Sequence, residues 1–220
     1  MYKRQLNVEA VAGLKPSVII ADRSVGPKEA LDQLRKSGIP VVLVDPHRSV
    51  GSTPQLIRTI AEAVGKPDAG EALVKRTQEQ IDQAKKQIAA WKPAKPMRVA
   101  FLYVRGNAGV FFILGSENGA SELIQGVGAD DVASDKGITT LVPANAESLV
   151  SINPDAIFVM RDGLASTGGM KGLLARAGVA NTTAGRKQRV ISIPDGISLS
   201  FGPQTGEVLT AVAKALYGVK

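Results

Sequence analysis

The stretch LNVEAVAGLKPSVII, residues 6–20, decides the fold because the chain repeats it as ANAESLVSINPDAIFV at residues 144–159. At an offset of 138 residues, an asparagine, a glutamate and a proline coincide, and apolar positions meet apolar positions. Each copy has apolar residues at i, i+3 and i+4, then a proline and a continuous apolar run. The pattern predicts short amphipathic helices over 9–15 and 147–153, each followed by a buried parallel strand.

The similarity continues beyond the strand. Residues 26–45, GPKEALDQLRKSGIPVVLVD, predict a helix, a stop at Gly38 and a second strand. Residues 168–193, GGMKGLLARAGVANTTAGRKQRVISI, have the same order of signals. A single recurrence after more than a hundred residues indicates two related units and not a solenoid of short repeats.

One long helix is predicted between the two units. Asp68, with Glu71 three residues later, resembles a capping box, and Pro93 prevents continuation. About 24 residues at ~1.5 Å each make a rod of roughly 36 Å. We expect a rigid strut between the units; a surface helix packed on one domain is the alternative. The expected apolar stripe consists of Leu73, Thr77, Ile81, Ala84, Ile88 and Trp91.

The remaining elements indicate an α/β fold. Strand and helix signals alternate along residues 97–220, which predicts a parallel sheet with helices on both faces. We therefore expect two Rossmann-like lobes with mainly parallel sheets joined by one long helix. The predicted parts are a partial N-terminal lobe (1–67), a bridging helix (68–92) and a C-terminal lobe (97–220). Because the C-terminal part has 124 residues and the N-terminal part 67, we expect an N-terminal truncation of about 57 residues.

Composition excludes some classes of partner. Apolar residues make up 44% of the 220-residue chain, enough for a substantial core. The net charge of +7 comes from 27 basic and 20 acidic residues, but the basic residues are scattered and only 4% of residues are aromatic. These features argue against nucleic-acid binding. No apolar run approaches the ~20 residues of a membrane span, and the absence of cysteine leaves the redox compartment open.

Candidate ligand-binding residues follow the predicted strands, because open α/β sheets bind ligands outside the carboxyl ends of their strands. Tyr103 and Arg105 follow the strand RVAFLYV, and Met160 and Arg161 follow the strand of the second repeat. The loop GISLSFGPQT, residues 196–205, follows the last strand. The only histidine, His47, stands in a loop without a neighbouring metal-ligand partner, so we expect it to be solvated.

Four segments resemble a known family. They are YKRQLNVEAVAGLKP, GVFFILGSENGASELI, GGMKGLLARAGVANTTAGRKQRVISI and FGPQTGEVL. The chain is similar over nearly all its length to substrate-binding proteins of ABC importers for iron compounds and cobalamin, and most of all to those for haem (hemin). In the last segment Gln204 stands where an arginine is usual in the family.

The resemblance implies a function. A periplasmic or cell-surface protein would capture haem between two lobes and deliver it to the permease dimer of an ABC importer. It would be peripheral to the membrane through that permease. Haem would be the transported ligand, with no catalytic cofactor and no enzymatic activity.

The resemblance also implies haem contacts. Tyr2 with Arg4 matches the family's ligand position, and Tyr103 with Arg105 gives the opposite lobe a similar pair. Tyrosinate oxygen suits ferric iron, so both tyrosines are expected as axial ligands of the haem iron. Met-Tyr-Lys-Arg-Gln is also the translation of a common sequencing-adapter end, which leaves the origin of residues 1–5 open. The expected haem-binding residues are Tyr2, Arg4, Tyr103, Arg105, Arg161 and Phe201; of Phe111, Phe112 and Phe201, we expect two to be buried in packing.

Glu9 and Glu147 occupy the same place in the two repeats. In the family each lobe presents one glutamate to an arginine of the permease dimer, so the resemblance implies that these two dock the protein. The alternative is that each carboxylate only stabilises its helix N-terminus through the dipole, worth ~0.3–1 kcal/mol.

Three other functions stay open. A ferric-siderophore or cobalamin carrier of the same fold would also suit arginines at the strand ends. An α/β enzyme acting on a phosphorylated or nucleotide substrate lacks a nucleophile elbow, a Walker loop and paired histidines or cysteines. A structural or interaction module is the third.

Overall fold

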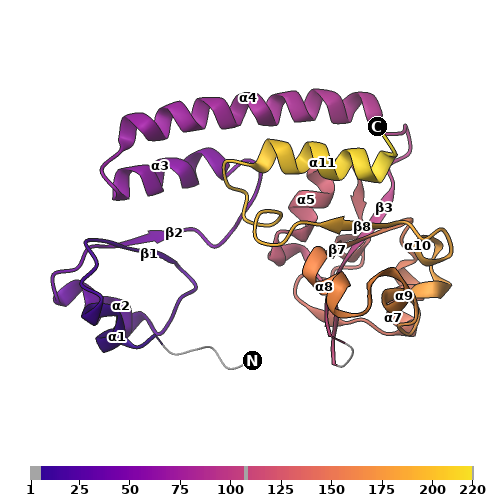
Figure 1. The fold of residues 1–220 in the computed structure, drawn as a ribbon, viewed down its shortest axis with the longest axis horizontal. Coiled ribbons are helices and arrows are strands. Elements are labelled where there is room, and N and C mark those ends of the chain that lie inside the picture. The colour runs from indigo at the N-terminus through magenta and orange to yellow at the C-terminus, as the bar shows by residue number, and fades with distance from the viewer. Residues whose placement is uncertain (1–5, 107–108, 220) are drawn as a thin grey trace.

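A computed structural model describes residues 6–106 and 109–219. Figure 1 shows two α/β units lying below one long helix, α4 (Pro67–Trp91), which extends over both. We call residues 6–66 the N-terminal unit and residues 97–219 the C-terminal unit. The expected long helix is therefore present, and it connects the two units.

The N-terminal unit has a sheet of two parallel strands. The strands are β1 (Ile19–Asp22) and β2 (Val41–Val44), paired in parallel. The helices are α1 (Val8–Gly13), α2 (Lys28–Lys36) and α3 (Thr53–Ala63). In Figure 1, α1 and α2 lie on the side of the strands away from α4, and α3 lies between the strands and α4.

The C-terminal unit has a six-stranded, mainly parallel sheet. Its order is β6-β4-β3-β7-β8, and β5 pairs with β3. The strands β3, β5, β7 and β8 are parallel, as expected, whereas β4 and β6 pair in the antiparallel direction at one edge and were not predicted. The strands are β3 (Arg98–Arg105), β4 (Val110–Ile113), β5 (Asp130–Asp131), β6 (Val142–Pro143), β7 (Ala156–Met160) and β8 (Val190–Ile193).

Helices cover both faces of this sheet. One face packs against α4, α5 and α11, through residues that include Ile88, Leu123 and Leu209. The other face packs against α7, α9 and α10, through Leu149 and Leu173 among others. None of the described helices is both long and apolar enough to cross a membrane. The helices of this unit are η1 (Ser116–Asn118), α5 (Ala120–Gly126), α6 (Val132–Asp135), α7 (Ala146–Ile152), α8 (Arg161–Ser166), α9 (Gly169–Leu174), η2 (Val179–Asn181), α10 (Thr183–Arg186) and α11 (Thr205–Tyr217).

The two copies of the repeat have the same local structure. The N-cap Asn7 accepts a hydrogen bond from the Ala10 N–H at 2.9 Å, and the N-cap Asn145 accepts one from the Ser148 N–H at 2.8 Å. Each bond satisfies a backbone donor that the first turn of a helix leaves free. The two short helices predicted over 9–15 and 147–153 are thus present as α1 and α7, and the asparagine caps, which were not predicted, explain why they begin where they do.

Both repeat helices are followed by a left-handed residue, which is the C-cap of α7 but lies one position beyond the C-cap of α1. Lys15 and Asn153 have positive φ angles of 49° and 35°, and a proline follows each of them. A residue in the left-handed region terminates the helix, and the proline prevents it from resuming. The chain then enters β1 in one unit and β7 in the other.

The start of α4 differs from expectation. The N-cap is Lys66, with no side-chain capping bond, so the predicted capping role of Asp68 is wrong. Pro67 at the first helical position has a suitable φ and needs no hydrogen-bonded N–H. Glu71 instead accepts hydrogen bonds from Arg58 of α3 at 2.6 and 3.1 Å. The buried stripe is close to the predicted one and consists of Gly70, Val74, Thr77, Ile81, Ala84 and Ile88.

Two glycines allow close helix contacts with α4. A Cβ atom added at Gly70 of α4 would lie 2.4 Å from the Cβ atom of Ala61 in α3. One added at Gly206 of α11 would lie 2.6 Å from the backbone carbonyl carbon of Gln80 in α4. Both distances are shorter than packed carbon atoms allow, so α3 and α11 each approach α4 at a position that requires glycine.

Candidate functional site

The carboxyl ends of β3, β7 and β8 bring three charged residues together. Met160 at the end of β7 is in register with Ile193 at the end of β8. Beyond them, Asp195 accepts a hydrogen bond from the Asp162 N–H at 2.9 Å through Oδ2. Its other oxygen, Oδ1, lies 3.5 Å from Nη2 of Arg105, which ends β3. One carboxylate therefore connects the ends of three parallel strands.

Tyr103 and Arg105 form the chemically most distinctive pair at this edge. The guanidinium carbon of Arg105 lies 5.8 Å from the centroid of the half-buried Tyr103 ring. The neighbouring Tyr103 side chain, aided by the carboxylates of Asp195 and Asp162, raises the pKa of Arg105 above its ordinary value. Arg105 therefore remains a cation beside a phenol oxygen, an arrangement suited to an electron-poor metal centre or an anionic group.

The turn after Arg105 is attached to the neighbouring helices. The Gly106 N–H donates a hydrogen bond to Ser166 Oγ at 2.9 Å, and Arg176 donates one to the Gly106 carbonyl. The Arg176 guanidinium carbon also lies 5.0 Å from the centroid of the Phe111 ring. Sequence reasoning missed Ser166, Arg176 and Asp195. Of these, only Asp195 had a usable signal, since it stands two residues after a predicted strand.

Arg161 and Phe201 lie in different environments. Arg161 is exposed at the first residue of α8, directly after β7, which is the strand end expected from the sequence. Phe201 is only 2% exposed and belongs to the core of the C-terminal unit. Its φ is 47°, and its carbonyl accepts a hydrogen bond from Thr53 Oγ1 at 3.0 Å. The Phe201 ring packs inward in this structure, and its expected contact with haem stays a prediction.

Tyr2 and Arg4, the other expected haem-binding pair, lie outside the described residues. The described part of the N-terminal unit places other polar side chains at its strand ends. Arg23, His47 and Arg48 line a cavity of about 320 Å³ there. Nη2 of Arg48 lies 3.6 Å from an Asp22 carboxylate oxygen.

The strand ends of the two units face one another. In Figure 1 the chain leaves β2 toward the C-terminal unit and leaves β8 toward the N-terminal unit. The residues that follow β2, Arg48 among them, and those that follow β8, Asp195 among them, therefore lead toward the other unit, and Arg105 contacts Asp195. No group of three or more His, Cys, Asp or Glu side chains within the described ranges is arranged to hold a metal ion.

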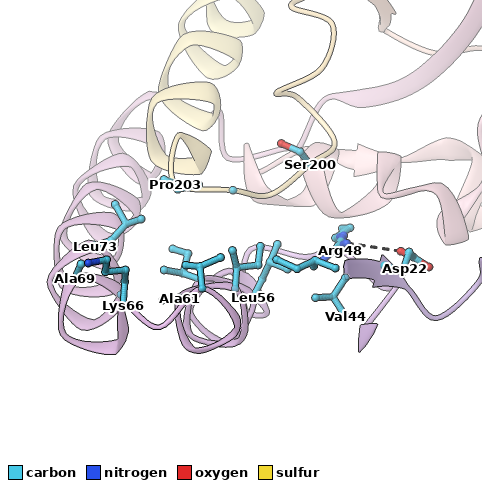
Figure 2. A pocket seen from close by; sticks show the side chains of 17 residues that line it. Asp22, Val44, Arg48, Leu56, Ala61, Lys66, Ala69, Leu73, Ser200 and Pro203 are labelled. Atoms are coloured by element: carbon cyan, nitrogen blue, oxygen red, sulfur yellow. Dashed lines mark ion pairs between the residues drawn. The ribbon is translucent and has the colours of Figure 1, made fainter. Parts of the chain in front are cut away.

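A larger cavity, of about 600 Å³, lies on the α3 side of β1 and β2, between α3, the first turns of α4 and residues 200–203 of the C-terminal unit (Figure 2). Figure 2 shows Arg48 and Asp22 at one end and Lys66 at the other, with apolar side chains between them. No tyrosine, histidine or methionine is among its lining residues, so it offers no iron ligand. We therefore place the ligand site at the strand ends and not in this cavity. The apolar lining includes Ile20, Val44, Leu56, Ile57, Ile60, Val64 and Leu73.

Glu9 and Glu147 have equivalent positions. Each is the second residue of its helix, α1 or α7, and each is exposed. Figure 1 shows α1 and α7 in different units, both on the side away from α4. Two carboxylates, one per unit, are thus available on that side of the molecule.

Comparison with known proteins gives consistent matches. A family model described as periplasmic binding protein matches residues 1–196. The crystal structure of the heme binding protein HmuT has a TM-score of 0.89 at 47% identity, covering 98% of this chain and 69% of that chain. The periplasmic heme-binding protein RhuT from Roseiflexus sp. RS-1, in apo form, has a TM-score of 0.89 at 34% identity, covering 99% and 81%.

A curated relative shows the same pattern. The uncharacterized ABC transporter substrate-binding lipoprotein YvrC of Bacillus subtilis (strain 168) is 26% identical over 96% of this chain and 65% of its own length. The chain spans less than two thirds of the length of the first curated relatives it matches. Structures of HmuT also exist with alanine in place of a tyrosine and of an arginine two positions further along.

Proposed function

Because this chain belongs to the periplasmic binding protein family, we propose that it acts as the substrate-binding protein of an ABC importer and that its ligand is haem. The observation that carries the proposal is the pairing of Tyr103 with Arg105 at the carboxyl end of β3, beside Asp195 at the end of β8. The likeness to HmuT at 47% identity and to RhuT at 34% supports haem over other ligands.

The chemistry of the pair suits ferric haem. Tyrosinate oxygen is one of the axial ligands that proteins use for haem iron. A hydrogen bond from a guanidinium stabilises the negative charge that the phenol oxygen carries when it binds iron. The tyrosine and arginine substituted in HmuT are two positions apart, which is also the spacing of Tyr103 and Arg105. We therefore assign Tyr103 as an axial ligand and Arg105 as its hydrogen-bond donor.

The two units then act as the lobes that close on the ligand, with residues 68–92 between them. The exposed Arg161 is placed to meet a haem propionate, since it directly follows the neighbouring strand. Tyr2 and Arg4 remain sequence predictions for the opposite side of the haem. The protein would work outside the cytoplasm, bind its permease and catalyse no reaction.

A hemin titration tests the ligand assignment. Wild-type protein is expected to shift the Soret band on binding hemin and to show a tyrosinate-to-iron charge-transfer band. Tyr103→Phe should remove the charge-transfer band and weaken binding, because the phenyl ring offers no oxygen. Tyr217→Phe is the matched control, since the Tyr217 hydroxyl donates to the Val127 carbonyl at 2.7 Å and belongs to α11. An unchanged charge-transfer band in Tyr103→Phe would contradict the assignment.

The competing ligand classes are tested with the same samples. Aquocobalamin and a ferric siderophore are titrated beside hemin, each followed by its own absorbance. Tighter binding of either one than of hemin would replace haem as the ligand but would leave the transport function in place.

Docking on the permease is the second part of the proposal. A protein with one anionic anchor per lobe matches a twofold permease, and charged contacts of this kind set register and association rate. The double variant Glu9→Ala with Glu147→Ala should lose uptake in cells that express the permease while it still binds hemin. The double variant Glu29→Ala with Glu122→Ala removes acidic residues from other first turns and is the control. Wild-type uptake in the first double variant would contradict the docking role.

A further inference from the structure

Asp195 is fixed by a contact that does not involve Arg105. Its Oδ2 atom accepts the Asp162 N–H at 2.9 Å, and this donor belongs to the backbone of the first turn of α8. Asp195 itself follows β8 by two residues, so both partners of this bond extend directly from buried strands. The second oxygen, Oδ1, is thereby directed toward the end of β3.

Arg105 is much less constrained without Asp195. Its side chain is 45% exposed, and a long guanidinium side chain loses considerable rotamer freedom when held in one place. The described partners of the guanidinium are the Tyr103 ring on one side and Asp195 on the other. Asp195 is therefore the group that can hold Arg105 against Tyr103 when no ligand is bound.

The contact contributes little to folding stability. An ion pair with an N to O distance of 3.5 Å and one partner nearly half exposed contributes about 0–1 kcal/mol. Oδ2 of Asp195 is held by the Asp162 N–H at 2.9 Å, and Oδ1 points to Arg105, which lies beside Tyr103. A role in folding stability alone would not explain this arrangement. The contact is therefore better suited to orienting the Arg105 guanidinium than to stabilising the fold.

We propose that Asp195 is a positioning residue for the ligand site, which holds the Arg105 guanidinium over the Tyr103 side chain so that the phenol oxygen is ready to bind ferric iron. The inference rests on the proposed function, since it assumes that Tyr103 binds haem iron. It adds a residue that touches neither haem nor iron and acts only through Arg105.

The test uses the 220-residue chain and hemin. Asp195→Asn keeps an oxygen that can accept the Asp162 N–H but removes the charge that attracts Arg105. Without a held guanidinium, the iron-bound phenolate is less stabilised and takes up a proton more readily. We expect about two- to fivefold weaker hemin binding. We also expect the pH midpoint for acid loss of the charge-transfer band to rise by roughly half a unit.

Two further variants separate positioning from charge. Asp162→Asn removes a nearby negative charge while leaving its backbone N–H in place, and it should shift the midpoint less than Asp195→Asn. Asp195→Glu restores a carboxylate and should recover part of the wild-type midpoint. Urea denaturation should show that all three variants unfold within about 1 kcal/mol of the wild type.

The outcomes are distinguishable. If the wild type shows no Soret shift, the proposed function fails and this inference falls with it. If the wild type binds hemin but Asp195→Asn keeps its affinity and its acid midpoint, the positioning role is overturned while the proposed function stands. Equal shifts in Asp162→Asn and Asp195→Asn would also overturn it, because net charge alone would then explain the effect.

Discussion

Helices α3 and α11 are counterparts in the two units, yet one is half-exposed and the other buried. Both pack against α4, and each begins at a buried threonine, Thr53 or Thr205. At the same spacing from these threonines, Ile60 is 38% exposed where Val212 is 3% exposed, and Val64 is 51% exposed where Leu216 is 3% exposed. The apolar pattern is the same, so the pattern alone does not produce burial.

The difference lies in a helix that covers one unit and not the other. In the C-terminal unit, α5 packs Leu123 and Ile124 into the core that also contains β7 and α11. Among residues 6–106 no helix takes this place beside β1 and α3, and the cavity of about 600 Å³ lies there (Figure 2). An amphipathic helix offers an apolar face, but an element distant in sequence must cover it.

Lysine substitutions at matched positions of α3 and α11 should give the largest difference in stability between the two units. Val212→Lys is expected to destabilise the protein by more than about 3 kcal/mol, because it places an unpaired charge in a closed core. Ile60→Lys should change the free energy of unfolding by less than about 1 kcal/mol, since the ammonium group reaches water. Urea denaturation measures both. Similar losses in the two variants would mean that the N-terminal unit is closed as well.

A second substitution should relieve the overpacking of a new methyl group between α4 and α3, but not between α4 and α11. Gly70→Ala and Gly206→Ala are each expected to cost about 1–3 kcal/mol through overpacking. In a double-mutant cycle, Ala61→Gly should recover about 1 kcal/mol with Gly70→Ala, because the Ala61 side chain is what the new methyl meets. Gln80→Ala should not rescue Gly206→Ala, whose methyl meets the Gln80 backbone. A rescue there would show that α11 is free to move away from α4.

The smallest expected difference is in pH dependence. Burial raises the pKa of the Asp131 carboxyl in the C-terminal unit, against hydrogen bonds from Ser121 and the Ala133 N–H that lower it. None of the described Asp or Glu side chains of residues 6–66 is buried. The folded state thus binds the Asp131 proton more tightly than the unfolded state does. Its contribution to stability therefore falls as pH rises from ~3.9 through the folded-state pKa.

Asp131→Asn removes this dependence. In urea denaturation between pH 4 and 7, the stability of the variant relative to the wild type should rise with pH and then level off. Asp135→Asn, at an exposed neighbouring position, is the control. A relative stability that falls with pH would show that hydrogen bonding to the carboxylate outweighs its burial.

The sequence predicted the parts of the site that lie within a few residues of a strand end. Tyr103 and Arg105 could be named because parallel strands align their carboxyl ends and ligands bind there. The antiparallel strand β4 was missed because its short apolar run follows a glycine-rich stretch and shows no alternation. The sequence could not tell which of Phe111, Phe112 and Phe201 is buried, because the burial of Phe201 depends on contacts with residues far away in the chain.

The sequence by itself determined the elements that depend on near neighbours. The Asn7 and Asn145 caps act over three residues, and the periodicity of α4 repeats within a turn or two. Tertiary structure alone decided that Asp195 meets Arg105, 90 residues away, and that Thr53 meets Phe201, 148 residues away. Local capping and periodicity are properties of a few consecutive residues, whereas these contacts exist only once the strands have paired in register and α4 has fixed the two units.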